Sequence, residues 1–350
     1  MMDAKLNPLQ LQIIEKLGEK PQQSSSEIFE LIDQPVAYAT VKRAIKNMLT
    51  LGYLELSGRG KASRYSISGA FRLLMPINVE QYFEKEMDER SIESSYNHSL
   101  IQSIMRSKTI FNSEEQAYLD ELQNQFKQNT SNLSDSAFKM EFERLAIDLS
   151  WKSSQIEGNT YSLLETERLI KLKEMAIGKS KDDAVMLLNH KEALDFIVDH
   201  LNYLEPLSVS AIEDIHSILI RDLNVERNLR QWRVGISGTN YKPLDNVYQI
   251  KEAMKAVCDL VNASNNVFEK AFLVLLFISY IKPFADGNKR TARIISNALL
   301  MHHHYCPISY RTIDSIDYKK AMLIFYEQNN MSAFKKIFID QFAFAVKTYF

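Results

Sequence analysis

Residues 271–293 constrain the fold of this chain more than any other stretch. The apolar run "AFLVLLFI" at 271–278 is far too short to span a bilayer, so it predicts a helix buried in a protein core. Pro283 cannot continue that helix, and "KRTARIISNALL" directly after the loop predicts another one. The stretch therefore predicts two helices joined by a short polar loop.

Composition favours a mainly α fold. The chain has 350 residues, which predicts two or three domains, and its net charge of −2 argues against a surface that binds polyanions throughout. Glycine and proline are scarce, at 10 and 8 residues, while helical spacing of apolar residues is common. The first ten residues contain no apolar signal region, and two cysteines are too few for a disulfide framework. We expect a cytoplasmic protein with no membrane segment.

Residues 1–75 are expected to form three helices followed by a two-stranded wing. Asn7 is suited to be the N-cap of the first helix with Pro8 at its first position, and Gly52 is suited to end the third. "YLEL" and "RYSIS" then alternate as strands. This order resembles a winged helix-turn-helix domain. Residues 76–130 are expected to be connecting helices, and residues 131–350 a further domain that carries the polar loop.

Basic residues dominate the third helix and the wing. Between residues 40 and 64 they outnumber the one acidic residue, Glu55, by six to one: Lys42, Arg43, Lys46, Arg59, Lys61 and Arg64. A helix with these side chains could enter the major groove of double-stranded DNA while the wing contacts the backbone. A solvated basic face on a dimerisation or protein-binding module is the alternative.

The loop after Pro283 combines groups that bind phosphate and a metal ion. Asp286 is a hard oxygen ligand suited to Mg²⁺. Gly287 lets backbone N–H groups approach an anion, and Asn288 supplies an amide. Arg290 and Arg293 lie three residues apart, on one side of a helix whose N-terminus is itself an anion site.

A second stretch, "SSQIEGN", is expected to end a helix at about 134–157. Gly158 favours the left-handed conformation that stops a helix, and Ser162 with Glu165 forms a capping box for the next one. Taken alone, Glu157 is a solvated carboxylate near a helix end.

The loop "KPFADGNKRTAR" at 282–293 resembles the signature of the Fic family, His-Pro-Phe-x-Asp/Glu-Gly-Asn-Gly/Lys-Arg-x-x-Arg, at eight of its nine specified positions. "SSQIEGN" is similar to the family's inhibitory motif, with Ser153, Glu157 and Gly158 in place. "RQWRVGISGTNYKPL" resembles the Fic flap, a β-hairpin beside the active site. The resemblance covers roughly residues 130–350 and implies a helical Fic core with a short β-hairpin flap, preceded by a winged helix.

Fic domains typically transfer AMP from ATP to a Ser, Thr or Tyr hydroxyl of a target protein. The resemblance implies that Asp286 binds Mg²⁺ and that ATP is held by Gly287, Asn288, Lys289, Arg290 and Arg293. It implies that Glu157 pairs with Arg293 and keeps the γ-phosphate from its productive position. It also implies that the flap aligns the target by strand addition, through Val234, Gly235, Ile236, Ser237, Gly238 and Thr239.

Lys282 departs from the family, whose histidine takes the proton of the attacking hydroxyl. A lysine pKa of about 10.4 would have to fall by some three units, worth roughly 4 kcal/mol, for that task at pH 7. Two functions stay open: an impaired, autoinhibited protein adenylyltransferase, and a nucleotide-binding transcriptional regulator without catalysis. The target, the chain itself included, the DNA site and a homo-oligomeric state are open as well.

One further motif, "MHHHYC" at 301–306, also suggests metal binding. Consecutive histidines do not share a helix face, so a polar helix end is the expected interpretation.

Overall fold

The computed structural model describes residues 6–106 and 109–350, which divide into two compact units. The first contains the chain up to Ile77 with Gln102–Glu114, and the second contains Asn78–Ile101 with Glu115–Phe350. The expected connecting region 76–130 thus contributes to both units. Its residues 107 and 108, like residues 1–5 of the expected N-terminal domain, lie outside the described residues.

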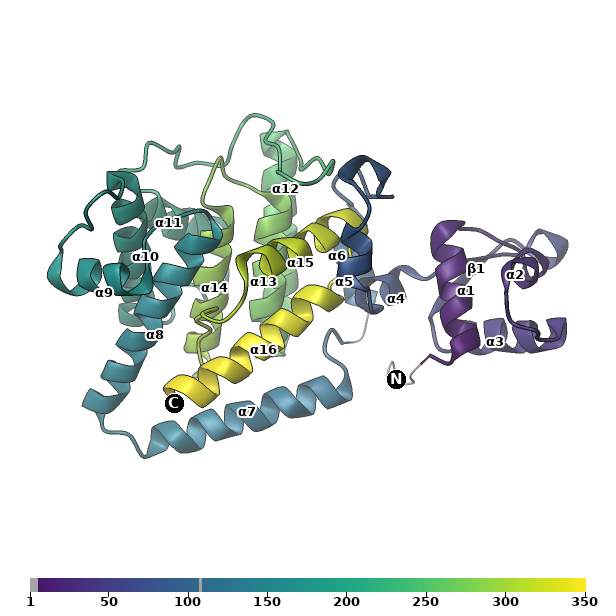
Figure 1. Ribbon diagram of the computed structural model, residues 1–350, viewed down its shortest axis with the longest axis horizontal. Helices are drawn as coiled ribbons and strands as arrows, with labels where there is room; N and C mark the ends of the chain where they lie inside the picture. Colours follow the sequence, from purple (N-terminus) through teal and green to yellow (C-terminus); the bar gives the residue numbers. More distant parts are fainter. Residues whose placement is uncertain (1–5, 107–108) are drawn as a thin grey trace. The chain divides into compact units, whose positions relative to one another are not determined.

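In its described residues the first unit has α-helices and a two-stranded antiparallel sheet, with the three expected helices before the strands (Figure 1). Its elements are α1 (Pro8–Glu19), α2 (Ser25–Leu31), α3 (Tyr38–Thr50), β1 (Leu54–Ser57), the 3-10 helix η1 (Gly60–Ala62), β2 (Arg64–Ile67), α4 (Gly69–Leu74) and most of α6 (Leu100–Arg106). The strands pair in a register that places Leu54 opposite Ile67.

Local sequence determines where these helices begin and end. Asn7 caps α1 in a capping box with Gln10, and Pro8 is the first helical residue, as the sequence predicts. Gly52 has a φ of 75°, which explains why α3 ends there. The helices bury one apolar stripe each, and these stripes meet β1 and β2 in a core that includes Ile13, Leu17, Ile28, Val41, Ile45 and Met48.

In the described residues of the second unit the regular elements are all helices. It contains α5 (Val79–Phe83), the 3-10 helix η2 (Met87–Glu89), most of α7 (Ser113–Ser131), α8 (Asp135–Ile156), α9 (Leu163–Leu172), α10 (Lys181–Asp199), α11 (Val209–Leu219), α12 (Val247–Ala263), α13 (Val267–Ile281), α14 (Asn288–His302), α15 (Ser315–Gln328) and α16 (Ser332–Tyr349). The mainly α fold expected from the sequence is confirmed. In the part of the chain that the structure describes, no helix is long and apolar enough to cross a membrane.

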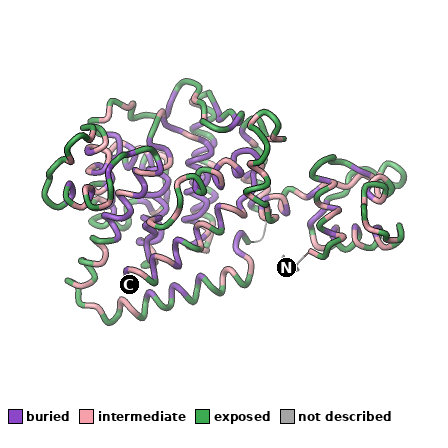
Figure 2. Tube along the Cα trace, viewed as in Figure 1, coloured by how far each residue is buried: buried purple, intermediate pink, exposed green. Residues whose placement is uncertain are grey.

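Helix α13 forms the centre of this unit and packs chiefly against α14 (Figure 1). All but two of its residues are buried, and Figure 2 shows burial concentrated along this pair of helices. A helix that is apolar on every side must be surrounded by other elements, and α12 and α15 also contact α13. Since α13 and α14 are consecutive, the loop between them is held at both ends by the core.

Candidate active site

The loop between α13 and α14 is built around a buried aromatic side chain. Lys282 ends α13 in the left-handed region, with φ 48° and ψ 62°, and Pro283 then directs the chain away from the helix. Phe284 is fully buried and stacks on the ring of His216 in α11, with ring centroids 3.6 Å apart and planes within 4°. His216 Nε2 also contacts the backbone oxygen of Asp286 at 2.9 Å.

Asn288 closes the loop on itself. Its side-chain oxygen accepts from the backbone N–H of Phe284 at 2.9 Å, and its amide nitrogen donates to the backbone oxygen of Phe284 at 2.9 Å. Both polar ends of this buried amide are therefore used inside the loop. The sequence assigned this side chain to the ligand, whereas in the structure it fixes the shape of the loop.

Gly287 opens α14 without a side-chain cap. Its φ is 79°, and an added Cβ would lie 3.3 Å from Ile220 and 3.4 Å from the His216 ring. Glycine is thus required twice, by the left-handed backbone and by the close neighbours. Because no side chain caps the helix, the first N–H groups of α14 and its positive dipole end are suited to an anion.

Two buried arginines stand on the first turns of α14. Arg290 is 1% exposed, donates to the backbone oxygen of Leu219 at 3.4 Å and contacts Asp286 Oδ2 at 3.2 Å. Arg293 is fully buried, and its guanidinium lies over the ring of Tyr318. Within the described residues, Arg290 Nε and Arg293 Nη1 are buried donors without an acceptor. An unpaired buried donor is costly, so these groups fit an anion supplied by a ligand.

The end of helix α8 places a carboxylate, that of Glu157, beside Arg293. Arg293 Nε donates to Ser153 Oγ and its Nη2 to the Ser153 backbone oxygen, both at 2.8 Å. Glu157, the C-cap of α8, places Oε1 3.4 Å from Arg293 Nη2 and Oε2 3.6 Å from Lys289 Nζ. Burial alone would raise the pKa of Glu157, but Lys289, Arg293 and Arg290 hold that pKa below its ordinary value. Gly158 follows with φ 102° and ends the helix.

The Lys282 side chain is bonded to the segment expected to be the flap. Its ammonium donates to the backbone oxygen of Gly235 at 3.1 Å. Burial and the cation of Lys289 lower the pKa of Lys282, with Arg230 acting in the same direction and the carboxylates of Glu157 and Asp286 in the opposite one. The lysine therefore links the loop to the segment expected to be the flap.

The expected flap is not a paired hairpin. Residues 226–246 contain no strand; Val234, Gly235 and Ile236 have no regular secondary structure, Ser237 and Gly238 form a turn, and Thr239 is buried. The physical reason is that backbone groups here bond to other segments. Gly235 accepts from Lys282, Gly238 accepts from Arg90 Nη2 at 2.8 Å, and Lys242 donates to Ser94 at 3.0 Å.

The residues present fit a magnesium ion in the company of phosphates. Asp286 is the exposed carboxylate of the loop, with 66% of its side chain accessible, and Mg²⁺ is commonly bound by one or two carboxylates plus phosphate oxygens and water. The ion pair of Asp286 with Arg290 holds the carboxylate beside the start of α14.

Three buried residues escaped the sequence analysis. Arg230 donates to the backbone oxygens of Lys282 at 2.6 Å, Trp232 at 2.7 Å, and Leu244. His190 in α10 is fully buried with neither ring nitrogen bonded within the described residues, and burial beside Arg293 and Arg290 lowers its pKa well below the ordinary value. The ring of His216 stacks on that of Phe284. A lone histidine or arginine in a helical pattern gives no signal for such roles, because the contacts are made far along the chain.

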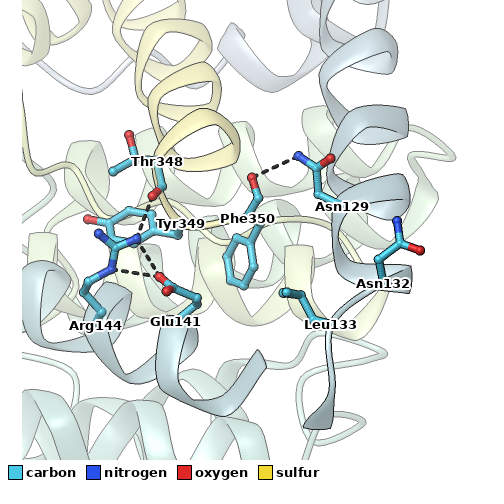
Figure 3. Close-up of a pocket in the computed structure, with 8 residues that line it drawn as sticks. All are labelled: Asn129, Asn132, Leu133, Glu141, Arg144, Thr348, Tyr349 and Phe350. Atoms are coloured by element: carbon cyan, nitrogen blue, oxygen red, sulfur yellow. Dashed lines mark hydrogen bonds and ion pairs between the residues drawn. The ribbon is translucent and has the colours of Figure 1, made fainter. Parts of the chain in front are cut away.

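The structure also contains a pocket away from this loop (Figure 3). It measures about 380 Å³ and is lined by residues from the end of α7, the start of α8 and the end of α16. Its charged groups bond to each other and to the backbone: Arg144 pairs with Glu141 and donates to the backbone oxygen of Thr348 at 2.6 Å. This pocket therefore presents no free reactive group.

A comparison with known protein families finds a match that includes this loop. Residues 206–300, from the start of α11 through most of α14, match the Fic/DOC family model. These residues form a Fic/DOC domain, with α13, the loop and α14 at its centre.

Two curated relatives are named protein adenylyltransferases. The protein adenylyltransferase Fic of Nematostella vectensis is 28% identical over 173 residues, covering 48% of this chain and 40% of the relative. The protein adenylyltransferase fic-1 of Caenorhabditis elegans is 25% identical, covering 44% of this chain and 31% of the relative. The chain thus matches less than half the length of these relatives.

Solved structures show the same fold. Residues 134–508 of Fic-1 from C. elegans superpose with a TM-score of 0.59 at 17% identity, covering 71% of this chain and 76% of that one. A Fic-domain signalling protein from Bacteroides thetaiotaomicron gives a TM-score of 0.55 at 20% identity, covering 66% and 94%.

Proposed function

We propose that this chain is a Fic-type protein adenylyltransferase that transfers AMP from ATP to a hydroxyl of a protein, and that two of its own contacts restrain it. The observation that carries the proposal is the ion pair between Glu157 and Arg293. Within the described residues, the other hydrogen bonds of this buried arginine go to Ser153, and its Nη1 has no acceptor. The names of the curated relatives support the reaction class.

Each site residue has a separate role in the proposed transfer of AMP. The target oxygen attacks the α-phosphorus, the bond from that phosphorus to the bridging oxygen breaks, and pyrophosphate leaves. The uncapped N–H groups of α14 and the Arg290 guanidinium hold the phosphates, and Asp286 would hold Mg²⁺, which neutralises phosphate charge when bound. Glu157 competes with the γ-phosphate for Arg293, so the triphosphate is misplaced while that carboxylate stays.

The proton of the attacking hydroxyl is the weak point of this chain. Lys282 stands where the signature has its base, and as an ammonium it has no lone pair. Its lowered pKa reduces that obstacle, while an approaching polyphosphate favours the charged form again. Lys282 also occupies the Gly235 oxygen, an acceptor that a target strand would need along residues 234–239. Both effects slow transfer.

Relief of the Glu157 contact tests the proposal. ATP labelled at the α-phosphate is incubated with cell lysate and with wild type, Glu157→Gly, or Glu157→Gly combined with Arg290→Ala. We expect more label on protein, the chain itself included, with Glu157→Gly, and loss of that gain with Arg290→Ala. Glu174→Gly is the matched control, because its carboxylate pairs with Arg168 on the surface. Equal labelling by wild type and Glu157→Gly would remove the lock from the proposal.

Nucleotide binding is tested separately by calorimetry with a non-hydrolysable ATP analogue and Mg²⁺. We expect Arg290→Ala to weaken binding at least tenfold, since a charged hydrogen bond to phosphate is lost from a buried position. Equal affinities would exclude the loop as the nucleotide site.

A second candidate function is a nucleotide-binding regulator without catalysis, with the first unit supplying DNA binding. Two observations favour it. Lys282 replaces the base of the loop, and Lys42, Arg43 and Lys46 are exposed together on α3. Of the wing residues, Arg59 and Lys61 are exposed, while Arg64 lies 4.0 Å from Glu27 and donates to the backbone of Ser63. Analogue binding without any label transfer would support this function over the first.

A further inference from the structure

The far end of α14 gathers three side chains that the sequence did not connect. His302 is the last residue of the helix, and His303 is its C-cap, with φ −89° and ψ 12°. Glu205 comes from the segment between α10 and α11. One potential ligand atom from each of the three lies within 4.8 Å of the other two. The sequence predicted a polar helix end because consecutive helical histidines diverge, but here the helix ends between them.

Two of these atoms lack a hydrogen bond although they are shielded from solvent. Among the described residues, Glu205 Oε2 and His303 Nε2 are buried atoms with no hydrogen-bond partner, and they lie 3.7 Å apart. In a tetrahedral zinc site with bonds of about 2.0–2.1 Å, neighbouring ligand atoms lie roughly 3.4 Å apart. The observed separation therefore leaves space for an ion between the two atoms after a small adjustment.

Neighbouring groups orient two of the three ligands, His302 and Glu205. His302 Nδ1 lies 3.1 Å from the backbone oxygen of Leu201, which can only accept, so the ring proton belongs on Nδ1 and Nε2 carries the lone pair. Lys270 donates to Glu205 Oε1 at 2.8 Å and leaves Oε2 for a single metal bond. The C-terminal end of a helix also has a negative partial charge, which favours a cation.

We propose that Glu205, His302 and His303 bind a divalent transition-metal ion, Zn²⁺ in preference to Mg²⁺. Two imidazoles and one carboxylate form a donor set that zinc accepts, with water as the fourth ligand, whereas Mg²⁺ prefers oxygen alone. The ion fastens the chain around Leu201–Glu205 to the end of α14. This site is separate from the loop at Asp286, because a helix of 15 residues places its ends roughly 21 Å apart.

Lys270 is expected to weaken zinc binding, so replacing it tests the direction of the change in affinity. Its ammonium sits on the same carboxylate and repels a divalent cation. Lys270→Met removes that repulsion while keeping an apolar stem, so zinc should bind at least threefold more tightly. If the Lys270–Glu205 pair only held Glu205 in place, Lys270→Met would weaken zinc binding instead.

The test uses the full chain without an affinity tag, stripped by a chelator that is then removed. Zinc is titrated in competition with a chromophoric chelator, and Co²⁺ absorption reports the coordination geometry. We expect one zinc per chain, and Tm higher by roughly 5 °C at a hundredfold excess over Kd. His303→Asn and Glu205→Gln should each weaken binding at least tenfold.

His304→Asn is the matched control, since His304 is exposed, has φ 59° and lies outside the cluster, and asparagine tolerates that backbone. It should bind like wild type, as should Asp286→Ala. Far-UV circular dichroism verifies that each variant is folded. The proposal is overturned if wild type binds no zinc at micromolar concentration. It is equally overturned if folded His303→Asn and Glu205→Gln both bind like wild type.

Discussion

Lys282 decides whether this chain has a general base, because it stands where the Fic signature has its histidine. Its ammonium bonds to the backbone oxygen of Gly235 and, while charged, has no lone pair, and burial lowers its pKa. A histidine at the same helix exit would supply that lone pair, since its ordinary pKa is near 6.5. Its shorter side chain would also release the Gly235 oxygen.

Lys282→His is therefore expected to raise AMP transfer by roughly 10²–10⁴-fold, the usual size of general-base catalysis. The comparison is Glu157→Gly with and without Lys282→His, because a misplaced γ-phosphate would hide any gain. Label transfer to protein measures the effect, and Lys282→Gln is the control that removes the charge without adding a base. Equal transfer by the histidine and glutamine forms would show that proton removal does not limit the reaction.

His216 predicts a pH dependence of stability. Burial lowers its pKa from 6.5 to about 4, so between these values the unfolded chain binds a proton that the folded chain does not. The stability due to the neutral ring is therefore complete above pH 6.5 and is lost as pH falls toward 4.

The free energy of unfolding, relative to a His216→Asn variant, should fall by about 1.4 kcal/mol per pH unit in that window, or roughly 3 kcal/mol in all. Urea unfolding at several pH values, in a chelator and without nucleotide, measures it. A difference between the two proteins that does not change from pH 7 to pH 4 would contradict the assigned pKa.

At the scale of elements, the start of α14 depends on one glycine. Gly287 and Gly178 have nearly the same backbone, with φ of 79° and 78°, but an added Cβ meets Ile220 and His216 only at Gly287. Alanine at either position pays for the left-handed backbone, about 1–2 kcal/mol.

We expect Gly287→Ala to lower the free energy of unfolding by about 1 kcal/mol more than Gly178→Ala, because crowding adds to the backbone cost. It should also weaken binding of an ATP analogue, since the first N–H groups of α14 shift. Chemical unfolding and calorimetry of the two variants test this; equal losses of stability would show that the neighbours give way freely.

Arg230 holds the loop and the flap segment together from one side. Its guanidinium donates to backbone oxygens of Lys282, Ile281, Trp232 and Leu244 while 1% exposed. Arg230→Met would leave these acceptors buried without donors, and we expect a loss of roughly 3 kcal/mol or more in the free energy of unfolding.

The matched control for that loss is Arg233→Met. Arg233 pairs with Asp245 while 68% of its side chain is exposed, and a surface ion pair contributes at most about 1 kcal/mol. Urea unfolding compares the two variants. A similar, small loss in both would mean that water replaces Arg230 at the buried carbonyls.

For the whole molecule, the sequence predicted what depends on neighbours along the chain. The cap at Asn7, the end of α3 at Gly52 and the end of α8 at Glu157 follow from local chemistry, and the structure has them there. The buried run of α13 followed from its composition. These features need no knowledge of which helices meet.

The bonding of individual side chains, within the loop or to distant segments, was not predictable. Asn288 was expected to face a phosphate but bonds to Phe284, because the loop folds back on its own backbone. The flap was expected as a hairpin, but Lys282 and Arg90 take its carbonyl groups. Glu205 meets His302 and His303 across almost a hundred residues, which no local pattern records. Local sequence thus does not determine which partners these side chains bond to.

The first unit has a surface that allows a direct test of nucleic-acid binding. Lys46 on α3 and Arg59 in the wing are exposed, and two phosphate contacts at these positions would release about two counterions. Lys46→Glu combined with Arg59→Glu should therefore weaken binding to double-stranded DNA and reduce the slope of log K against log salt by about two. Fluorescence anisotropy of a labelled duplex at several salt concentrations measures both quantities. Lys16→Glu with Lys20→Glu makes the same change of charge on α1 and should alter neither. If the two double variants bind DNA equally, net charge alone explains the binding, and α3 with the wing does not enter a groove.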